Sequence, residues 1–342
     1  MIIVKRRFAD NWVFLHMLIP AVFKNCVAFI GCFVNGNMSV RGSAFFMARS
    51  LRGTDSLAQY LVTSQHLLNG IKEDSDDQVV WVKVNMKDNP AKWIPTDIDE
   101  WRLHPRNPQN VDVAVLPIYR IGGWENAHFL GFDESISKDE LSLREDIGLG
   151  DEVNIIGLFT SAHGMAKISP IVRCGTIARM PEGNIGIQLG KTSYGLTSGY
   201  LVETHSTGGL SGSPVFLNVR DVYVTEDGIP KYRELFYLLG IMYGHWNLFV
   251  EESKDLLDEL REVIEQINTG ISIVIPASRI YEILERDDLV KDREEMIEAL
   301  LMEKMPVPDT IKPELTRAEF MEKLEKASRP EEAPPDEGTS ET

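Results

Sequence analysis

A serine flanked by glycines is the residue of this chain best suited to nucleophilic chemistry. Ser211 lies in the segment G-G-L-S-G-S-P, residues 208–214, between two strand-like runs. Glycines on both sides let the backbone turn tightly, so amide groups can point at one spot while the hydroxyl stands clear. Because glycine and serine are also the commonest turn formers, this loop alone indicates only a turn.

A histidine and an aspartate supply the partners that such a serine needs. His66 follows the β-rich run 59–63, and Asp112 lies in the apolar run V-D-V-A-V-L, residues 111–116. An unpaired charge in a buried strand is costly, so Asp112 needs a partner. An imidazole N–H is one such partner, and a neutral histidine held in this way can accept a serine proton on its other nitrogen. The three side chains together predict a nucleophile, its general base and an orienting carboxylate.

Two blocks of short β-rich runs must position these residues. The first block, 24–120, carries His66 and Asp112, and the second, 150–286, carries Ser211. Two such blocks with almost no intervening helix predict an all-β chain built from two barrels or a sandwich pair. The runs are 26–34, 38–47, 59–63, 79–84 and 111–118 in the first block, and 153–159, 168–173, 175–179, 185–189, 199–203, 214–219, 235–243 and 271–275 in the second.

Helical signals occur mainly outside these runs. Apolar residues at helical spacing predict an amphipathic helix inserted at 252–267, and Ser278 is expected to cap a closing helix. A capping box and a hydrophobic staple predict a short helix over 316–327. The other segments are an N-terminal extension (1–23), an inter-barrel connection (121–149) with a capping box at 137–140, and an acidic tail (287–342) that ends in disordered residues and is a candidate docking segment for a protein partner.

Composition narrows the classes of function. The chain has 52 acidic and 35 basic side chains and a net charge of -17, which disfavours nucleic acid as a partner. Its three cysteines are odd in number and form no C-x-x-C pair, so neither a disulfide framework nor a metal site is expected, and a reducing, cytoplasmic compartment fits. The apolar run 12–23 superficially resembles a signal peptide but contains His16 and Pro20, which leaves secretion open. No other run approaches a membrane span, and no cofactor is implied.

The order His66, Asp112, Ser211, with separations of 46 and 99 residues, resembles the trypsin-like (chymotrypsin-fold) serine peptidases, particularly their disulfide-free intracellular or bacterial members. The motifs T-S-Q-H, D-V-A-V and G-L-S-G-S-P carry the resemblance, which covers roughly residues 24–286. It implies two six-stranded antiparallel β-barrels with the triad in the groove between them. It also implies a serine endopeptidase that cleaves polypeptides through an acyl-enzyme.

The same resemblance implies roles for further residues. The backbone amides of Gly209 and Ser211 are expected to form the oxyanion hole. The segment 240–244 resembles the strand that lines the substrate cleft, which makes Met242, Tyr243 and Gly244 candidate substrate contacts. His205, six residues before the nucleophile, corresponds to the floor of the primary specificity pocket. A charged His205 could favour acidic side chains and a neutral one polar or apolar side chains, so the preference stays open.

Three alternatives compete with this prediction. A phosphate loop at 190–192 fails because Ile185 stands where the motif requires glycine. An α/β-hydrolase fails because position 213 is serine instead of glycine and no crossover helices are expected. The third alternative is a trypsin-like module that no longer cuts and serves as a protein-binding scaffold. The intact triad favours a peptidase.

The remaining histidines have no metal-ligand spacing: His16, His104, His128, His163 and His245.

Overall fold

The computed structural model describes most of the two β-rich blocks. The described residues are 6–8, 11–13, 21–86, 90–120, 124, 132–133, 147–159, 167–188, 194–204, 209–224, 228, 230–247 and 268–301. The capping box at 137–140, the inserted helix at 252–267, His205 and the tail helix at 316–327 lie outside them.

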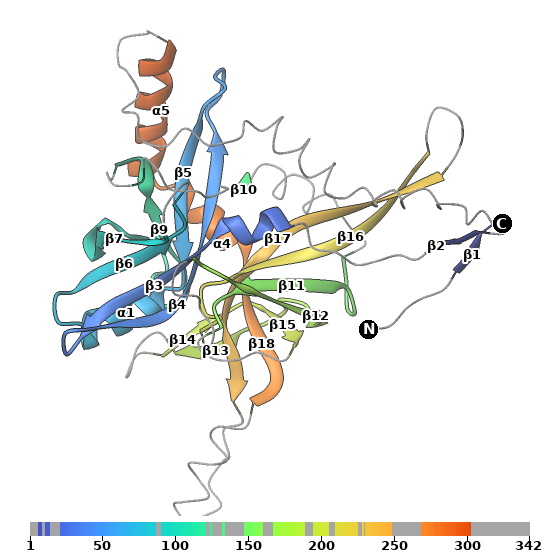
Figure 1. Ribbon diagram of the computed structural model, residues 1–342, viewed down its shortest axis with the longest axis horizontal. Helices are drawn as coiled ribbons and strands as arrows, with labels where there is room; N and C mark the ends of the chain where they lie inside the picture. The colour runs from blue at the N-terminus through green and yellow to red at the C-terminus, as the bar shows by residue number, and fades with distance from the viewer. Residues whose placement is uncertain are drawn as a thin grey trace, which may run out of the picture.

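The first unit is a curled sheet (Figure 1). Neighbouring strands of this sheet pair antiparallel in the order β7-β6-β3-β4-β5-β9-β8, and β10 pairs parallel with β4. Within the described residues the two end strands of this path, β7 and β8, do not pair with each other, so the sheet stays open. β8 is only two residues long and pairs with β9. The strands are β3 (Val27–Val34), β4 (Asn37–Ser50), β5 (Leu57–Thr63), β6 (Val79–Val84), β7 (Lys92–Asp97), β8 (Arg102–Leu103), β9 (Ala114–Pro117) and β10 (Phe132–Asp133).

The second unit is a closed barrel of six strands in the order β11-β12-β15-β18-β17-β16. A separate hairpin, β13 with β14, lies between β12 and β15 in the sequence, and another, β1 with β2, precedes the first unit. The bounds are β11 (Glu152–Gly157), β12 (Ile171–Arg179), β13 (Ile185–Gln188), β14 (Tyr194–Thr197), β15 (Tyr200–Glu203), β16 (Pro214–Val224), β17 (Pro230–Asn247), β18 (Asn268–Pro276), β1 (Arg6–Phe8) and β2 (Asn11–Val13). The predicted fold class, an all-β chain of two barrel-like units with C-terminal helices, is confirmed. The second unit is the predicted six-stranded barrel, whereas the first, also predicted as a six-stranded barrel, is a curled sheet of eight strands.

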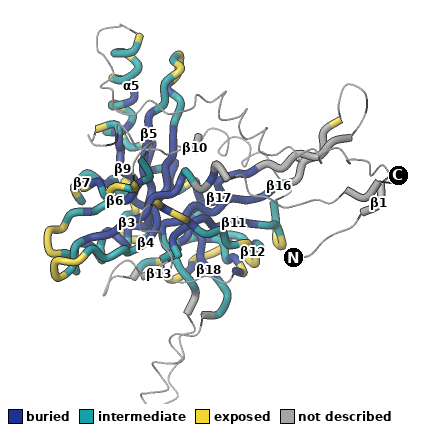
Figure 2. The backbone as a smooth tube through the Cα atoms, in the orientation of Figure 1, coloured by how far each residue is buried: buried dark blue, intermediate teal, exposed yellow. Residues whose placement is uncertain are grey.

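Alternating side chains of β5 show how the core is divided. Successive residues of a strand point to opposite faces of a sheet. Tyr60 and Val62 pack into an apolar cluster that continues into the second unit through Phe216 and Ile275, whereas Leu61 packs into a cluster confined to the first unit. Figure 2 shows the buried backbone concentrated where the two units meet. The shared cluster fixes how the two units sit against each other.

Two α-helices directly follow strands, and a third continues from the second of them. Helix α1 (Gln65–Asp74) begins directly after β5, and α4 (Ala277–Leu284) begins directly after β18. Ser278 lies inside α4 instead of capping it, because Pro276 takes the N-cap position without a side-chain cap. Helix α5 (Asp287–Leu301) is an addition to the predicted elements. The short 3-10 turns are η1 (Ala21–Cys26), η2 (Ile98–Glu100) and η3 (Ile118–Arg120).

None of the described helices combines the length and the apolar character that a membrane-spanning helix needs.

Candidate active site

The pairing of β5 with β9 brings His66 and Asp112 to the same end of the first sheet. Thr63, the last residue of β5, pairs with Ala114, the first residue of β9. Because the strands are antiparallel, the residues that follow β5 and those that precede β9 lie side by side. His66 comes three residues after Thr63, on the first turn of α1, and Asp112 comes two residues before Ala114. Asp112 therefore precedes its strand, whereas the sequence pattern placed it inside one.

Asp112 uses both carboxylate oxygens to hold His66. Its Oδ2 lies 2.6 Å from His66 Nδ1, and its Oδ1 accepts the backbone N–H of His66 at 2.7 Å. The first backbone N–H groups of a helix have no partner within the helix, and the N-cap residue of α1, Ser64, makes no side-chain capping bond. The Asp112 carboxylate takes part of that role, and the helix dipole favours a negative charge there.

This contact also assigns the hydrogen on the imidazole ring. An ionised carboxylate can only accept hydrogen bonds, so Nδ1 of His66 carries the hydrogen and donates it to Asp112. Nε2 is then the basic nitrogen. The Asp112 side chain is fully buried, whereas that of His66 is 22% exposed, so the ring reaches the surface while the group that orients it does not.

The turn that carries Ser211 depends on glycines. Gly209 and Gly212 have φ values of 97° and 81°, in the left-handed region that side chains disfavour. At Gly212 a Cβ would also lie 2.0 Å from the carbonyl oxygen of Ser43 on β4. The turn is closed by Ser213 N–H donating to the Leu210 carbonyl at 3.0 Å, and Gly212 N–H donates to the Met242 carbonyl on β17 at 2.8 Å. The Ser211 hydroxyl is thus presented from a backbone held on both sides.

Ser211 and His66 both contact Tyr243 of β17. The Ser211 hydroxyl donates to the Tyr243 carbonyl at 2.8 Å, and the Tyr243 ring meets the His66 ring edge to face with centroids 5.2 Å apart. Among the described residues, Ser211 Oγ has no hydrogen bond to His66. The serine and the histidine therefore contact the same tyrosine, and the Ser211 hydroxyl directs its hydrogen at the Tyr243 carbonyl.

Two of the predicted substrate contacts, Met242 and Gly244 of β17, lie in different surroundings. The Met242 side chain packs inside the second barrel, while its carbonyl accepts from Gly212 and from the Ser64 hydroxyl, the latter at 3.3 Å. Gly244 borders the serine, because a Cβ at this position would lie 4.0 Å from Ser211 Oγ. The next residue, His245, is half-buried, and burial lowers the pKa of its imidazole, which favours the neutral ring beside the site.

Sequence patterns gave no indication of Ser43. Its backbone N–H donates to the Ser211 carbonyl at 2.9 Å, and its hydroxyl donates to the Gly209 carbonyl at 3.1 Å. No motif marks it. The available signal was a glycine and a serine, Gly42 and Ser43, directly before the apolar run 44–48 of β4, since small residues in a strand mark a close approach of another backbone.

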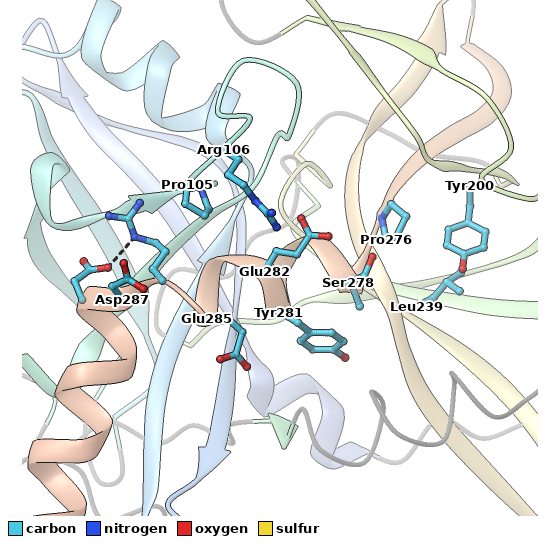
Figure 3. A pocket seen from close by; sticks show the side chains of 13 residues that line it. Pro105, Arg106, Tyr200, Leu239, Pro276, Ser278, Tyr281, Glu282, Glu285 and Asp287 are labelled. Carbon is cyan, nitrogen blue, oxygen red and sulfur yellow. Dashed lines mark hydrogen bonds and ion pairs between the residues drawn. The ribbon is translucent and has the colours of Figure 1, made fainter.

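A pocket of about 1100 Å³ lies away from these residues (Figure 3). Its walls come from the loop after β8, the end of β18, α4 and the start of α5. Arg106 and Glu282 extend toward each other across it. None of the three candidate catalytic residues lines this pocket.

In the described part of the chain, no cluster of three or more His, Cys, Asp or Glu side chains is arranged to hold a metal ion.

Comparisons with known proteins give likenesses of structure. No family model matches the sequence, and none of the curated proteins does. The chain is similar to the crystal structure of the Rv3671c protease of M. tuberculosis in its active form, with 15% identity and a TM-score of 0.40 over 78% of this chain and 83% of that chain. An inactive form of the same protease gives 12% identity and a TM-score of 0.35 over 76% and 88% of the two chains. A variant of the tobacco etch virus protease gives 10% and 0.38 over 77% and 79%. At these values the likeness assigns no activity, which has to be inferred from the residues of this chain.

Proposed function

We propose that this protein is a serine endopeptidase in which Ser211 is the nucleophile, His66 the general base and Asp112 the residue that orients the base. One observation carries the proposal. A buried carboxylate fixes the Nδ1–H tautomer of His66 by a 2.6 Å contact, and the ring so fixed lies against the same tyrosine as a serine hydroxyl on a glycine turn. A carboxylate, an imidazole and a serine in this order are the parts that nucleophilic acyl transfer needs.

The first half of the reaction forms an acyl-enzyme. Nε2 of His66 takes the proton of Ser211 as Oγ forms a bond to the carbonyl carbon of the scissile peptide. Asp112 stabilises the imidazolium that results. When the C–N bond breaks, His66 gives the proton to the leaving amine, and the acyl group remains on Ser211. In the second half, water repeats the sequence, with its proton passing through His66 and the serine hydroxyl restored.

Backbone amides are proposed to stabilise the charge on the carbonyl oxygen. Within the described residues, the amide nitrogens of Gly209 and Ser211 have no acceptor. Unpaired N–H groups beside the nucleophile can bind the oxyanion, and such donors contribute strongly to catalysis because they need no reorganisation. Tyr243 and Gly244, which border Ser211, are proposed to contact the polypeptide substrate.

Covalent labelling tests this function. A fluorophosphonate probe should label the wild-type protein, and Ser211→Ala and His66→Ala should abolish the label. Peptide turnover of Ser211→Ala should fall on the order of 10⁶-fold. Its thermal unfolding should hardly change, because among the described residues the hydroxyl makes a single, partly exposed hydrogen bond, to the Tyr243 carbonyl. A label that survives in Ser211→Ala would place the nucleophile elsewhere.

A protein-binding scaffold without activity is the second candidate. It is favoured by the hydrogen bond of the Ser211 hydroxyl to the Tyr243 carbonyl, which turns the nucleophile away from its base. The labelling experiment separates the two. A wild-type protein that resists the probe at every pH tested supports the scaffold.

A further inference from the structure

Ser43 holds the nucleophile turn from the opposite unit. It lies on β4 of the first sheet, is fully buried, and makes two hydrogen bonds to the turn of the second unit. Its backbone N–H donates to the carbonyl of Ser211 at 2.9 Å, and its hydroxyl donates to the carbonyl of Gly209 at 3.1 Å. These carbonyls belong to the peptide groups on either side of the Leu210–Ser211 peptide, which carries the N–H of Ser211. Ser43 therefore holds the turn on both sides of that N–H.

The hydrogen-bonding capacity of the Ser43 hydroxyl is directed by a third contact. The backbone N–H of Leu158, just past β11, donates to Ser43 Oγ at 2.8 Å. A hydroxyl has one hydrogen and can accept in its lone-pair directions. Because Leu158 occupies an acceptor position of Oγ, the single hydrogen is left for Gly209. The hydroxyl is therefore locked in one orientation by the second unit and used to hold a carbonyl of that same unit.

These contacts restrain the peptide planes that surround the proposed oxyanion hole. A peptide unit is planar, so a carbonyl that is held fixes the N–H of the following residue and the torsion of the residue that bears it. The Leu210 carbonyl, bonded to Ser213 N–H, fixes the direction of the Ser211 N–H. Ser43 fixes the neighbouring plane between Gly209 and Leu210. The N–H of Gly209 belongs to the preceding plane, and its direction relative to the held plane depends on the torsions of Gly209. At a φ of 97° no side chain restricts these torsions, so holding the Gly209 carbonyl removes part of the freedom that would misdirect its N–H.

We propose that Ser43 is a positioning residue for the oxyanion hole: its hydroxyl orients Gly209 so that the amides of Gly209 and Ser211 converge on the substrate oxygen. This proposal rests on the proposed peptidase function. It assigns a role in transition-state stabilisation to a side chain that touches neither the substrate nor His66. Loss of the hydroxyl is therefore expected to lower kcat while KM stays nearly constant.

The experiment compares Ser43→Ala, Ser43→Cys and wild type in the full-length protein. Reactive sites are counted by exhaustive fluorophosphonate labelling, and peptide turnover is expressed per labelled site, which removes the contribution of unfolded molecules. Deleting one oxyanion donor costs about 10²- to 10³-fold in kcat, so a misaligned donor should cost about 10- to 100-fold in Ser43→Ala. Cysteine fills the space with a weaker donor and should fall between alanine and serine. The acid limb of the pH profile should stay unchanged, because the contacts of Ser43 do not include His66.

Thr96→Val is the matched control. The Thr96 hydroxyl on β7 is also buried, donates to the Val80 carbonyl at 2.9 Å and accepts from the Trp101 indole at 3.2 Å, but it lies in a strand away from the turn. Its loss should affect stability without changing turnover per labelled site. Equal turnover per site in serine, cysteine and alanine variants, an order other than serine, cysteine, alanine, or an equal loss in Thr96→Val would overturn the role of Ser43. If Ser43→Ala yields no folded protein, Ser43→Cys decides by the same criterion. A wild-type protein that neither labels nor turns over would instead refute the peptidase function.

Discussion

The two carboxylate oxygens of Asp112 hold two different hydrogens of the same residue. Oδ1 accepts the backbone N–H of His66, and Oδ2 faces Nδ1 of its ring. The first contact supports the start of α1, and the second sets the tautomer that the proposed catalysis requires. Stability and activity therefore depend on different atoms of one side chain, and a substitution that changes only one of those atoms can separate them.

Asp112→Asn makes this separation. The asparagine oxygen can still accept the His66 N–H, whereas its NH₂ group faces Nδ1 and forces the ring hydrogen onto Nε2, which can then no longer accept the serine proton. We expect kcat for a peptide substrate to fall about 10⁴-fold. We expect the free energy of unfolding to change by less than about 2 kcal/mol. Enzyme kinetics and urea unfolding measure the two effects, and Asp112→Ala, which loses both contacts, should be clearly less stable than Asp112→Asn. Turnover of Asp112→Asn within tenfold of wild type would contradict the assigned role.

At the scale of elements, the strands that build the core were predictable and the edge of the first sheet was not. Runs such as 79–84 combine β-branched residues with few breakers, and β6 has the predicted bounds. β7, with the sequence KWIPTD, contains a proline, which normally counts against a strand. It lies at the end of the sheet path, where β6 is its pairing neighbour, and an edge strand tolerates the missing N–H of Pro95.

The contact between His66 and Asp112 was predictable, because a carboxylate in an apolar run needs a partner and an imidazole N–H can supply it. Helix α5 was not, because its sequence is dominated by charge and its packing depends on partners distant in the sequence. Arg293 is buried, and its guanidinium donates to the hydroxyl of Tyr60 at 3.0 Å, a contact that no local pattern encodes. Ser43 was missed for the same reason, since its role exists only once the two units meet.

An ion pair between α4 and the loop after β8 should make stability depend on pH. The carboxylate of Glu282 lies 2.5 Å from His104 Nε2 and 3.0 Å from Arg279. Burial raises the pKa of Glu282, but the hydrogen bonds and charges of His104 and Arg279 outweigh it, and the net pKa is lowered. A carboxyl group whose folded pKa is lowered stabilises the fold above its unfolded pKa of about 4.3, and this contribution is lost as pH falls through the folded value.

Glu282→Gln tests this linkage. At pH 7 the variant should be less stable than wild type by on the order of 1 kcal/mol. The difference should shrink as pH falls below about 4, because the wild-type carboxylate is then protonated as well. Urea unfolding at a series of pH values measures this difference in unfolding free energy between the variant and wild type. Glu294→Gln, a change at an exposed position of α5, serves as the control and should show no such convergence. A stability gap between Glu282→Gln and wild type that is constant from pH 7 to about 3 would contradict the ion pair.

At the scale of the whole molecule, the chain crosses from the second barrel back to the first sheet. After β18 and α4, helix α5 packs Leu289 into the shared core, and Tyr119 donates to Asp292 at 3.0 Å. Arg102, next to β9 in the sheet, contacts Asp288 at 2.7 Å. Burial, together with Tyr60 and Asp292, raises the pKa of the Tyr119 hydroxyl, so it remains a donor at neutral pH. The segment 287–301 is therefore occupied within the molecule, and we propose that a protein partner of the acidic tail binds beyond Leu301.

Two truncations separate these parts of the C-terminal segment. Removal of residues 302–342 leaves every described contact of α5 in place, so the melting temperature and the peptide turnover should match those of the full chain.

Removal of residues 287–342 also deletes the fully buried Leu289 and the buried Arg293. Burying a leucine contributes about 2 kcal/mol, and the loss of the Arg293 contacts adds a similar amount, so the melting temperature should fall by about 5 °C or more. Because α5 contacts β5 and the residues after β9, and these two strands adjoin His66 and Asp112, turnover near the lowered melting temperature should fall with it. Scanning calorimetry and turnover against temperature measure both effects, and equal melting temperatures for the two truncations would show that the contacts of α5 do not stabilise the fold.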